Sequence, residues 1–357
     1  MLRRACSAVL VLGLLALVAA APAAAGGNAY QVTNLVSDQP GEAAHTDSNL
    51  VNAWGLVAGP TTPWWVADNG TDVSTLYDGA GNPIPLVVNV PGGPTGLVFN
   101  GGSGFVVTDG TNSGAAPFLF ATEAGTIRGW NPGVPPPPPS TQTEIGADRS
   151  GVGASYKGLA IASTTGGDRL YAADFHNARV DVFDSDFGLV TMPGAFVDRK
   201  LPPRFAPFGI QNMGGRIFVT FAKQNADAED EVAGRGLGFV DVFDMDGALL
   251  GRVATRGLLN APWGLAMAPA GFGRFGGDLL VGNFGNGQIN AYHERPNGTF
   301  AHHGRLRTLG GRPIAIDGLW ALQFGNDAAA GSSGSLFFTA GPVDETHGLF
   351  GKIDPAG

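Results

Sequence analysis

The sequence predicts an all-β protein, a single six-bladed β-propeller, from a repeated apolar segment, the spacing of its copies and the turns between them. Each copy is a short apolar strand with a glycine near its start. Successive copies lie 41, 62, 51, 55 and 54 residues apart. Repeats of roughly 40–50 residues that contain several short strands are typical of propeller blades. The repeated glycines are Gly55, Gly96, Gly158, Gly209, Gly264 and Gly318.

Further strands follow most copies. WWVADNG, LYAADF and IFVTFA read as second strands, and STLYDGAG and RVDVFDSD read as third strands, with Asp-Gly and Asn-Pro turn signals between runs. We expect blades that start near residues 52, 94, 156, 206, 261 and 316. The second unit holds two candidate second strands, FVVTDG and FLFAT, and the pattern does not decide between them. Its proline run at residues 134–140 predicts an extended loop, because proline cannot donate to a strand ladder.

The last unit, residues 318–355, has room for only three strands. An isolated apolar run, YQVTNLVS at residues 30–37, precedes the first unit. We expect this N-terminal strand to complete the last blade. Pairing of the two chain ends would close the ring and cover the exposed strand edges.

Residues 1–25 have the pattern of a Sec-type signal peptide, and residues 26–357 form the predicted propeller. Arg3 and Arg4 give a basic start, AVLVLGLLALVAA is apolar, and APAAAGG offers small-residue cleavage sites. We therefore expect a secreted or periplasmic protein with no membrane span after cleavage. The single cysteine, Cys6, lies within the leader, so disulfides and thiolate catalysis are excluded from the mature chain.

The charge balance excludes two classes of partner. The chain has 21 basic and 30 acidic residues, a formal net charge of −9. Nucleic acids and anionic membrane surfaces select basic patches, so neither is an expected partner. Only 14% of residues are charged while 57 are glycine, which favours a tightly turned β-rich domain.

Two segments, VADNGTDVSTLYDGAG and LYAADFHNARVDVFDSD, resemble repeats of the NHL type, in which a strand ending in Asp is followed by a polar turn and a second such strand. The whole run is similar to an uncharacterised family of secreted bacterial proteins from genomes that use the PEP-CTERM sorting system. Segments such as NLVNAWGL, FAPFGIQN and LLVGNFGNGQINAYH carry that similarity. The resemblance implies an NHL-like propeller and an exported location, and it implies no particular activity.

Polar residues concentrate where the loops that lead into the first strands and leave the second strands of a propeller meet, around the channel. We expect a carboxylate- and amide-rich rim there that binds a small molecule, a glycan or a protein. The acidic run at residues 227–231 and the pair Asp344 and Glu345 belong to the same face. The candidate rim residues are His45, Asn52, Asp68, Asn69, Asp109, Asp174, His176, Asn260, Asn283, Asp317 and His347.

The repeated aspartates have two readings. Asp174 recurs as Asp68 and Asp109 at the expected ends of second strands, which favours a side chain that caps the following turn. The alternative is an axial metal. Calcium takes six to eight oxygen ligands, and converging histidines would suit zinc. The metal ligands would then be Asp68, Asp174, His176 and His347, with calcium or zinc as the ion.

The other candidates favour plain structural roles. His293, His302 and His303 fall in the outer part of the fifth blade, where we expect solvent exposure. The acidic run at 227–231 reads as a solvated insertion, with a calcium-bound loop as its alternative.

Two functions follow from this sequence. The first is an exported binding or scaffolding propeller that uses the polar rim. The alternative is a metal-dependent hydrolase or lyase, as a resemblance to lactonase-like propellers would imply. Those enzymes usually place a metal-binding Glu at the start of an inner strand, and this sequence has none there. The sequence leaves open whether the protein is an enzyme, and a purely structural envelope protein is the third reading.

Overall fold

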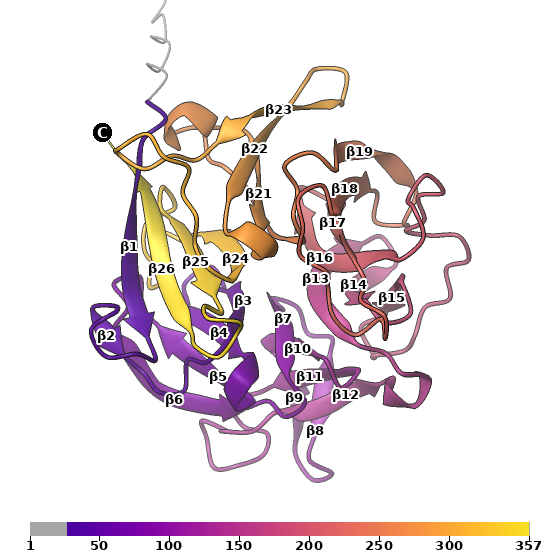
Figure 1. The fold of residues 1–357 in the computed structure, drawn as a ribbon. Helices are drawn as coiled ribbons and strands as arrows, with labels where there is room; N and C mark the ends of the chain where they lie inside the picture. The colour runs from indigo at the N-terminus through magenta and orange to yellow at the C-terminus, as the bar shows by residue number, and fades with distance from the viewer. Residues whose placement is uncertain (1–26, 357) are drawn as a thin grey trace, which may run out of the picture.

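The computed structural model describes residues 27–356, so the predicted signal peptide at residues 1–25 lies outside the described part of the chain. These residues form six blade sheets arranged around one axis, as Figure 1 shows, and one separate two-stranded sheet. Strands within each sheet run antiparallel, apart from the short β2. The first strands of the blades contact one another around the ring, so they line the axis. The predicted all-β, six-bladed propeller is confirmed.

The strands of blades 1 to 3 follow the repeats in chain order. Blade 1 is β3 (Ala53–Val57), β4 (Trp64–Asp68), β5 (Val73–Tyr77) and β6 (Pro83–Asn89). Blade 2 is β7 (Pro94–Phe99), β10 (Phe118–Thr122), β11 (Thr126–Trp130) and β12 (Glu144–Asp148). Blade 3 is β13 (Tyr156–Thr164), β14 (Gly167–Asp174) and β15 (Arg179–Phe183).

Blades 4 to 6 complete the ring. Blade 4 is β16 (Phe205–Met213), β17 (Arg216–Lys223), β18 (Gly238–Phe243) and β19 (Leu249–Thr255). Blade 5 is β20 (Pro262–Met267), β21 (Leu279–Asn283), β22 (Ile289–Glu294) and β23 (Phe300–Arg305). Blade 6 is β24 (Leu319–Phe324), β25 (Leu336–Ala340), β26 (Leu349–Pro355), β1 (Tyr30–Ser37) and β2 (His45–Thr46). In the described part of the chain, four single-turn 3₁₀ helices lie in loops, η1 (Asn69–Thr71), η2 (Ser150–Val152), η3 (Gly273–Phe275) and η4 (Phe284–Asn286).

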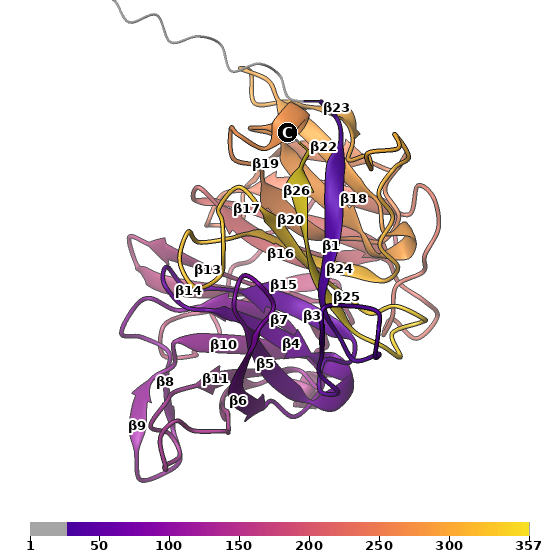
Figure 2. The same cartoon turned by 90° about the vertical axis from the view of Figure 1, so that its left-hand side faces the viewer.

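The N-terminal strand closes the ring as predicted. β1 pairs antiparallel with β26 from Tyr30 opposite Pro355 to Ser37 opposite Leu349. Figures 1 and 2 show the indigo β1 lying beside the yellow β26. The edge of β26 is thereby hidden, and the short β2 extends the blade outward by parallel pairing with β1.

The second blade contains an insertion that the sequence pattern did not resolve. Its second strand is β10, because β10 pairs with both β7 and β11. The run FVVTDG instead forms β8 (Val106–Thr108), which pairs with β9 (Ser113–Ala115) in a separate hairpin. The expectation that Asp109 ends a second strand was therefore wrong. Asp109 caps the turn of this hairpin, which projects at the lower left of Figure 2.

Small residues let the inner strands approach one another at the axis. A Cβ atom added to Gly158 would lie 2.7 Å from the carbonyl oxygen of Phe208, and one added to Gly264 would lie 2.5 Å from that of Trp320. The same close approach recurs from each inner strand to the next. Trp320 and Ala321 of blade 6 therefore occupy the positions that Trp263 and Gly264 occupy in blade 5. The small residue of the sixth inner strand is therefore Ala321. The assignment of Gly318 to that role was wrong by three residues.

Hydrophobic clusters fill the spaces between neighbouring blades. One joins blades 2 and 3 around Phe105, Leu119 and Phe183, and another joins blades 5 and 6 around Leu280 and Phe338. Burial of each such side chain contributes about 1.5–3 kcal/mol. The described residues include no helix that is long and apolar enough to cross a membrane.

Candidate functional site

The residue before the small residue of each inner strand lies near the axis. Four of these six positions are aromatic, and their rings contact one another across blades. Trp54 stacks on Trp320 with ring centroids 3.7 Å apart, and Trp263 and Phe208 meet Trp320 at 6.0 and 5.8 Å. Aromatic packing therefore fills the channel at this level. The six residues are Trp54, Thr95, Lys157, Phe208, Trp263 and Trp320.

Lys157 is the one ionisable member of this ring. Its side chain is only 2% exposed, and its ammonium lies 5.3 Å from the centroid of the Trp54 ring. A buried ammonium needs partners that replace water. It donates a hydrogen bond to Glu123, which follows β10, and it lies 3.6 Å from Oδ1 of Asp230 in the acidic loop after β17.

A hydrogen-bond network connects Glu123 to residues of blades 1 and 6. The amide of Asn69 donates to Oε2 of Glu123 at 2.8 Å. Asn52 donates to Oδ1 of Asn69 at 3.1 Å and to Oε2 of Glu345 at 2.7 Å. The indole N–H of Trp320 in turn donates to Oδ1 of Asn52 at 2.9 Å. Asn52 is buried and uses both ends of its amide, so the network fixes the position of Glu345.

Carboxylates outnumber cations in this cluster, and the pKa values reflect that imbalance. Burial raises the pKa of Glu231 to about 8; nearby Glu345 and Asp230 add to the rise, and Lys157 opposes it. Burial also raises the pKa of Glu345, and Glu123 and Asp230 act in the same direction. Burial alone would lower the pKa of Lys157, but Glu123 and the other carboxylates raise it above its ordinary value. The axial cluster is Glu123, Lys157, Asp230, Glu231 and Glu345.

A cavity of about 420 Å³ opens beside the axial cluster. Glu123, Lys157 and Asp230 form part of its wall, and His176 and Glu229 line it as well. The remaining lining residues are small, among them Ser150, Gly153 and Ser155. Gln224 fixes the neighbouring loop, because its side-chain amide donates to the carbonyl oxygens of Phe175 and His176.

The aspartate side chains at the ends of second strands accept hydrogen bonds from nearby backbone N–H groups. Asp174 accepts hydrogen bonds from the backbone N–H of Asn177 at 3.2 Å and from its side-chain amide at 2.8 Å. This geometry confirms the turn-capping interpretation of Asp174. The same expectation was wrong for Asp68, which makes no capping hydrogen bond to the turn after β4. Asp68 instead accepts from the N–H and hydroxyl of Thr75 in β5 at 2.9 and 2.8 Å, and burial raises its pKa well above the ordinary value.

In blade 5, asparagine side chains form hydrogen bonds with nearby backbone groups. The Asn283 side chain donates to the carbonyl of Leu258 at 2.8 Å and accepts from the backbone N–H of Asn260 at 3.1 Å. Asn260 accepts from the N–H of Gly234 at 2.5 Å, which ties the acidic loop of blade 4 to blade 5. Asp317 is exposed and accepts from the N–H of Val343 at 2.9 Å.

The histidines of the predicted rim do not come together. His45 lies in β2, the outermost strand of blade 6. His347 pairs through Nδ1 with Oδ2 of Asp38 at 2.6 Å, whereas His176 lines the cavity in blade 3. Within residues 27–356, the one group of three or more ligating side chains with atoms within 4.8 Å lies elsewhere. The expected metal set of Asp68, Asp174, His176 and His347 is therefore not assembled.

Lys157 and Glu123 were missing from the sequence-predicted site. A signal for Lys157 exists, because YKG replaces the AWG, PFG and PWG of other blades at the residue before the repeated glycine. A charged side chain at that position is buried near the axis, so an opposite charge must lie beside it. Glu123 was obscured because the second strand of its blade was not resolved.

Comparison with solved structures shows the fold alone. A streptogramin B lyase aligns over 92% of this chain and 97% of its own, with 11% identity and a TM-score of 0.51. A Bacteroides thetaiotaomicron protein of unknown function aligns over 91% of this chain and 76% of its own, with 11% identity and a TM-score of 0.56. A glucose dehydrogenase aligns over 91% and 99%, with 13% identity and a TM-score of 0.55. These structural neighbours are β-propeller proteins.

Sequence comparison places the chain among relatives. No protein-family model matches it. "Uncharacterized protein R648" of Acanthamoeba polyphaga mimivirus is 33% identical over 336 residues, covering 91% of this chain and 80% of its own. "Uncharacterized protein L690" of the same virus is 34% identical over 339 residues, covering 91% and 85%. The chain therefore belongs to the protein family that contains these two mimivirus proteins.

Proposed function

We propose that this propeller is a ligand-binding module whose site is the axial cluster with its adjoining cavity, and that its ligand is a small polar molecule with a positive charge. One observation carries the proposal. Four carboxyl groups from blades 2, 4 and 6 surround a single ammonium, that of Lys157, beside a cavity of about 420 Å³. Small-molecule sites typically have volumes of about 300–1,000 Å³.

The charge balance selects the class of ligand. At neutral pH the carboxyl of Glu231, with its pKa of about 8, is largely protonated, so Lys157 faces the carboxyl groups of Glu123, Asp230 and Glu345 and can neutralise only one of them. An entering cation would relieve the repulsion that helps to raise the pKa of Glu231 and of Glu345. A diamine suits the cavity because one ammonium could approach Asp230 and the other the carboxyl of Glu229, and both residues line it.

The protonation state of Lys157 favours binding over amine chemistry. Its pKa lies above the ordinary value, so the side chain stays an ammonium at neutral pH. A nucleophilic or Schiff-base lysine needs the opposite shift. In the proposed module, Lys157 organises the carboxylates and forms part of the wall of the site, with Trp54 packed behind its ammonium.

Calorimetric titration with putrescine tests the proposal. Asp230→Asn removes a charge from a side chain that is 66% exposed, so the fold should tolerate it. We expect wild type to bind putrescine and Asp230→Asn to bind it at least about tenfold more weakly, which corresponds to about 1.4 kcal/mol. Asp227→Asn, an exposed change in the same loop, is the matched control. Equal weakening by both variants would show a general ionic effect, and calcium chloride in place of putrescine distinguishes a metal from an organic cation.

An acid–base enzyme is the second candidate, on one specific observation. The pKa of Glu231 is raised to about 8, within the range that suits a general acid or base at neutral pH. A hydrolase or lyase with this group would lose turnover in Glu231→Gln while retaining ligand affinity. Such a mechanism needs a substrate that reaches Glu231 from the cavity.

We also propose that the protein is exported and belongs with the secreted bacterial propellers that its segments resemble. The support is the signal-peptide pattern of residues 1–25 and the matching segments of the propeller. Expression in a Gram-negative host followed by intact-mass analysis of the periplasmic fraction tests the export. A mass that begins near residue 26 supports it, and an unprocessed cytoplasmic product contradicts it.

A further inference from the structure

A second polar cluster lies on blade 5, outside the axial site. Asp278 directly precedes β21, and the pairing of Leu279 with Tyr292 places Asp278 beside His293 at the end of β22. The β22–β23 register shifts between Ala291 opposite Gly304 and Tyr292 opposite His302. His303 is the extra residue of this bulge. Bulges commonly redirect a side chain near functional sites.

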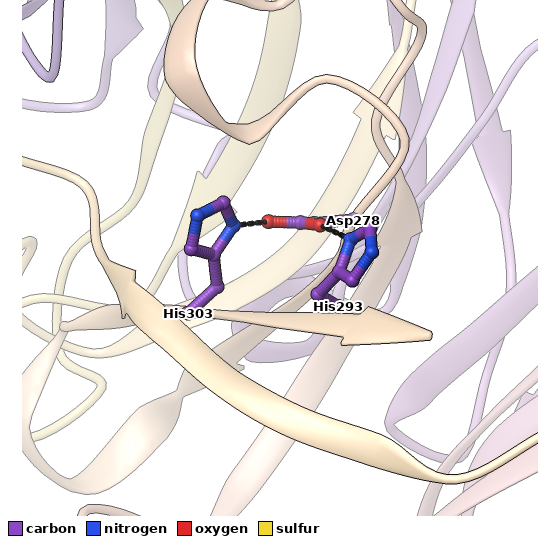
Figure 3. Close-up of side chains that lie close together, drawn as sticks. All are labelled: Asp278, His293 and His303. Atoms are coloured by element: carbon purple, nitrogen blue, oxygen red, sulfur yellow. Dashed lines mark hydrogen bonds and ion pairs between the residues drawn. The ribbon is translucent and has the colours of Figure 1, made fainter. Parts of the chain in front are cut away.

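The three side chains meet at one carboxylate, as Figure 3 shows. Nδ1 of His293 lies 2.8 Å from Oδ1 of Asp278, and Nδ1 of His303 lies 2.5 Å from Oδ2. The Asp278 side chain is 1% exposed, whereas those of His293 and His303 are 58% and 37% exposed. The buried carboxylate is thus reached from solvent through the two imidazoles.

The surroundings position this group. Phe275 contacts the His303 ring edge-on at a centroid distance of 5.4 Å. Within residues 27–356, no lysine or arginine forms an ion pair with Asp278. A buried carboxylate needs a compensating charge, and here two imidazoles are its side-chain partners.

We propose that Asp278, His293 and His303 form a site for a divalent transition-metal ion, zinc in the first place. One ligating atom from each residue lies within 4.8 Å of the others. Two imidazole nitrogens with one carboxylate oxygen are a donor set that suits zinc, nickel or copper, whereas calcium prefers oxygen ligands alone. A solvent molecule would fill the fourth position.

Metal entry requires a small rearrangement. Zinc bonds of about 2.1 Å hold tetrahedral ligand atoms about 3.4 Å apart, wider than the present hydrogen-bonded separations. The exposed imidazoles can rotate outward by this amount. Each histidine would present a proton-free Nδ1 to the ion, and Nε2 would carry the ring proton.

Nearby positive charge limits the affinity. Arg274, Arg305 and Arg307 line a cavity that His303 also borders. These guanidinium groups repel a dication, so we expect a dissociation constant in the micromolar range. An anion in this cavity would strengthen the site by offsetting the arginines.

Zinc titration of the full chain by calorimetry tests the site, with cobalt absorption as a report on the ligands. We expect one ion per chain, and His293→Ala and His303→Ala each to bind at least about tenfold more weakly. His302→Ala is the matched control, because His302 is an exposed neighbour that pairs across from Tyr292. It should bind zinc as wild type does, with an unchanged cobalt spectrum.

Two results would overturn the site. The first is no zinc binding by the wild-type chain, which would leave the cluster as a hydrogen-bonded support for β22 and β23. The second is a zinc affinity unchanged in His303→Ala but reduced in Asp230→Asn, which would place the ion at the axial cluster. Because Asp230→Asn leaves blade 5 untouched, failure of the diamine proposal and failure of this one are separable.

Discussion

The Lys157 ammonium on an inner strand of blade 3 and the Asp230 carboxylate on a loop of blade 4 lie 3.6 Å apart. This pair joins the buried aromatic ring at the axis to the solvent-exposed acidic loop. Because Lys157 also bonds Glu123 of blade 2, three blades meet at one ammonium. The charge at the centre of the propeller is therefore set by residues that are distant in sequence.

Replacement of Lys157 by methionine should destabilise the chain. The change preserves the apolar stem but leaves Glu123 without its cation. Removal of one partner from a buried ion pair costs about 3–5 kcal/mol, and the partial exposure of Glu123 points to the lower end. Urea unfolding measures the loss. Lys352→Met is the control, since Lys352 pairs with Asp354 near the surface, and a loss there above about 1 kcal/mol would contradict the distinction.

Glu231 should make stability fall as pH rises. Its pKa is about 8 in the folded chain against an ordinary value of 4.5, so the folded state binds the proton more tightly. The resulting stability is fully present below about pH 4.5 and is lost as the pH rises through about 8. We expect Glu231→Gln to melt at a higher temperature than wild type at pH 9 and to show a smaller decrease between pH 5 and pH 9. Glu229→Gln in the same loop should follow wild type; identical pH profiles for all three would refute the assignment.

Gly209 should not accept even one added methyl group. A Cβ there would fall on the carbonyl oxygen of Trp263 in the next inner strand, and that backbone cannot move aside cheaply. Overpacking costs about 1–3 kcal/mol, and we expect Gly209→Ala to reach the upper end. Gly251→Ala is the control, because no atom lies within 4 Å of its added Cβ. Thermal unfolding should show a large decrease for Gly209→Ala and no decrease for Gly251→Ala.

The N-terminal strand should be essential to the closed ring. Val36 of β1 is fully buried against a cluster that includes Trp64 and Phe350. Val36→Asp places an unpaired charge there, and we expect a loss of more than about 4 kcal/mol. Limited proteolysis should then release the N-terminal segment early. Gln31→Asp, an exposed position of the same strand, should leave the digestion pattern unchanged.

The sequence predicted the blades well because each repeat carries its own strand and turn pattern. It failed where two patterns look alike. The run FVVTDG has the composition of a blade strand, yet it forms an inserted hairpin that removes Asp109 from the expected face. In blade 6 the small residue of the inner strand is an alanine, Ala321, in place of the repeated glycine. The register of Trp320 and Ala321 therefore became apparent only from contacts between neighbouring strands.

The sequence indicated which face of the propeller carries the polar loop residues, but it did not identify Lys157 at the centre of the axial cluster. The predicted polar face included Asn52, Asn69 and Glu345, which one hydrogen-bond network joins in the structure. Convergence on Lys157 depends on distances across three blades, which no local pattern encodes. His293 and His303 were predicted to be exposed, and they are. Their meeting at Asp278 depends on one bulge in β23 that shifts the strand register.

The most direct test of the central claim is a crystal structure of the full chain grown with putrescine near pH 8. The account predicts one diamine in the cavity beside the axial cluster, with an ammonium within hydrogen-bonding distance of Asp230 or Glu229. A cavity that holds only water under saturating putrescine, with the ligand absent or bound elsewhere on the surface, would contradict it.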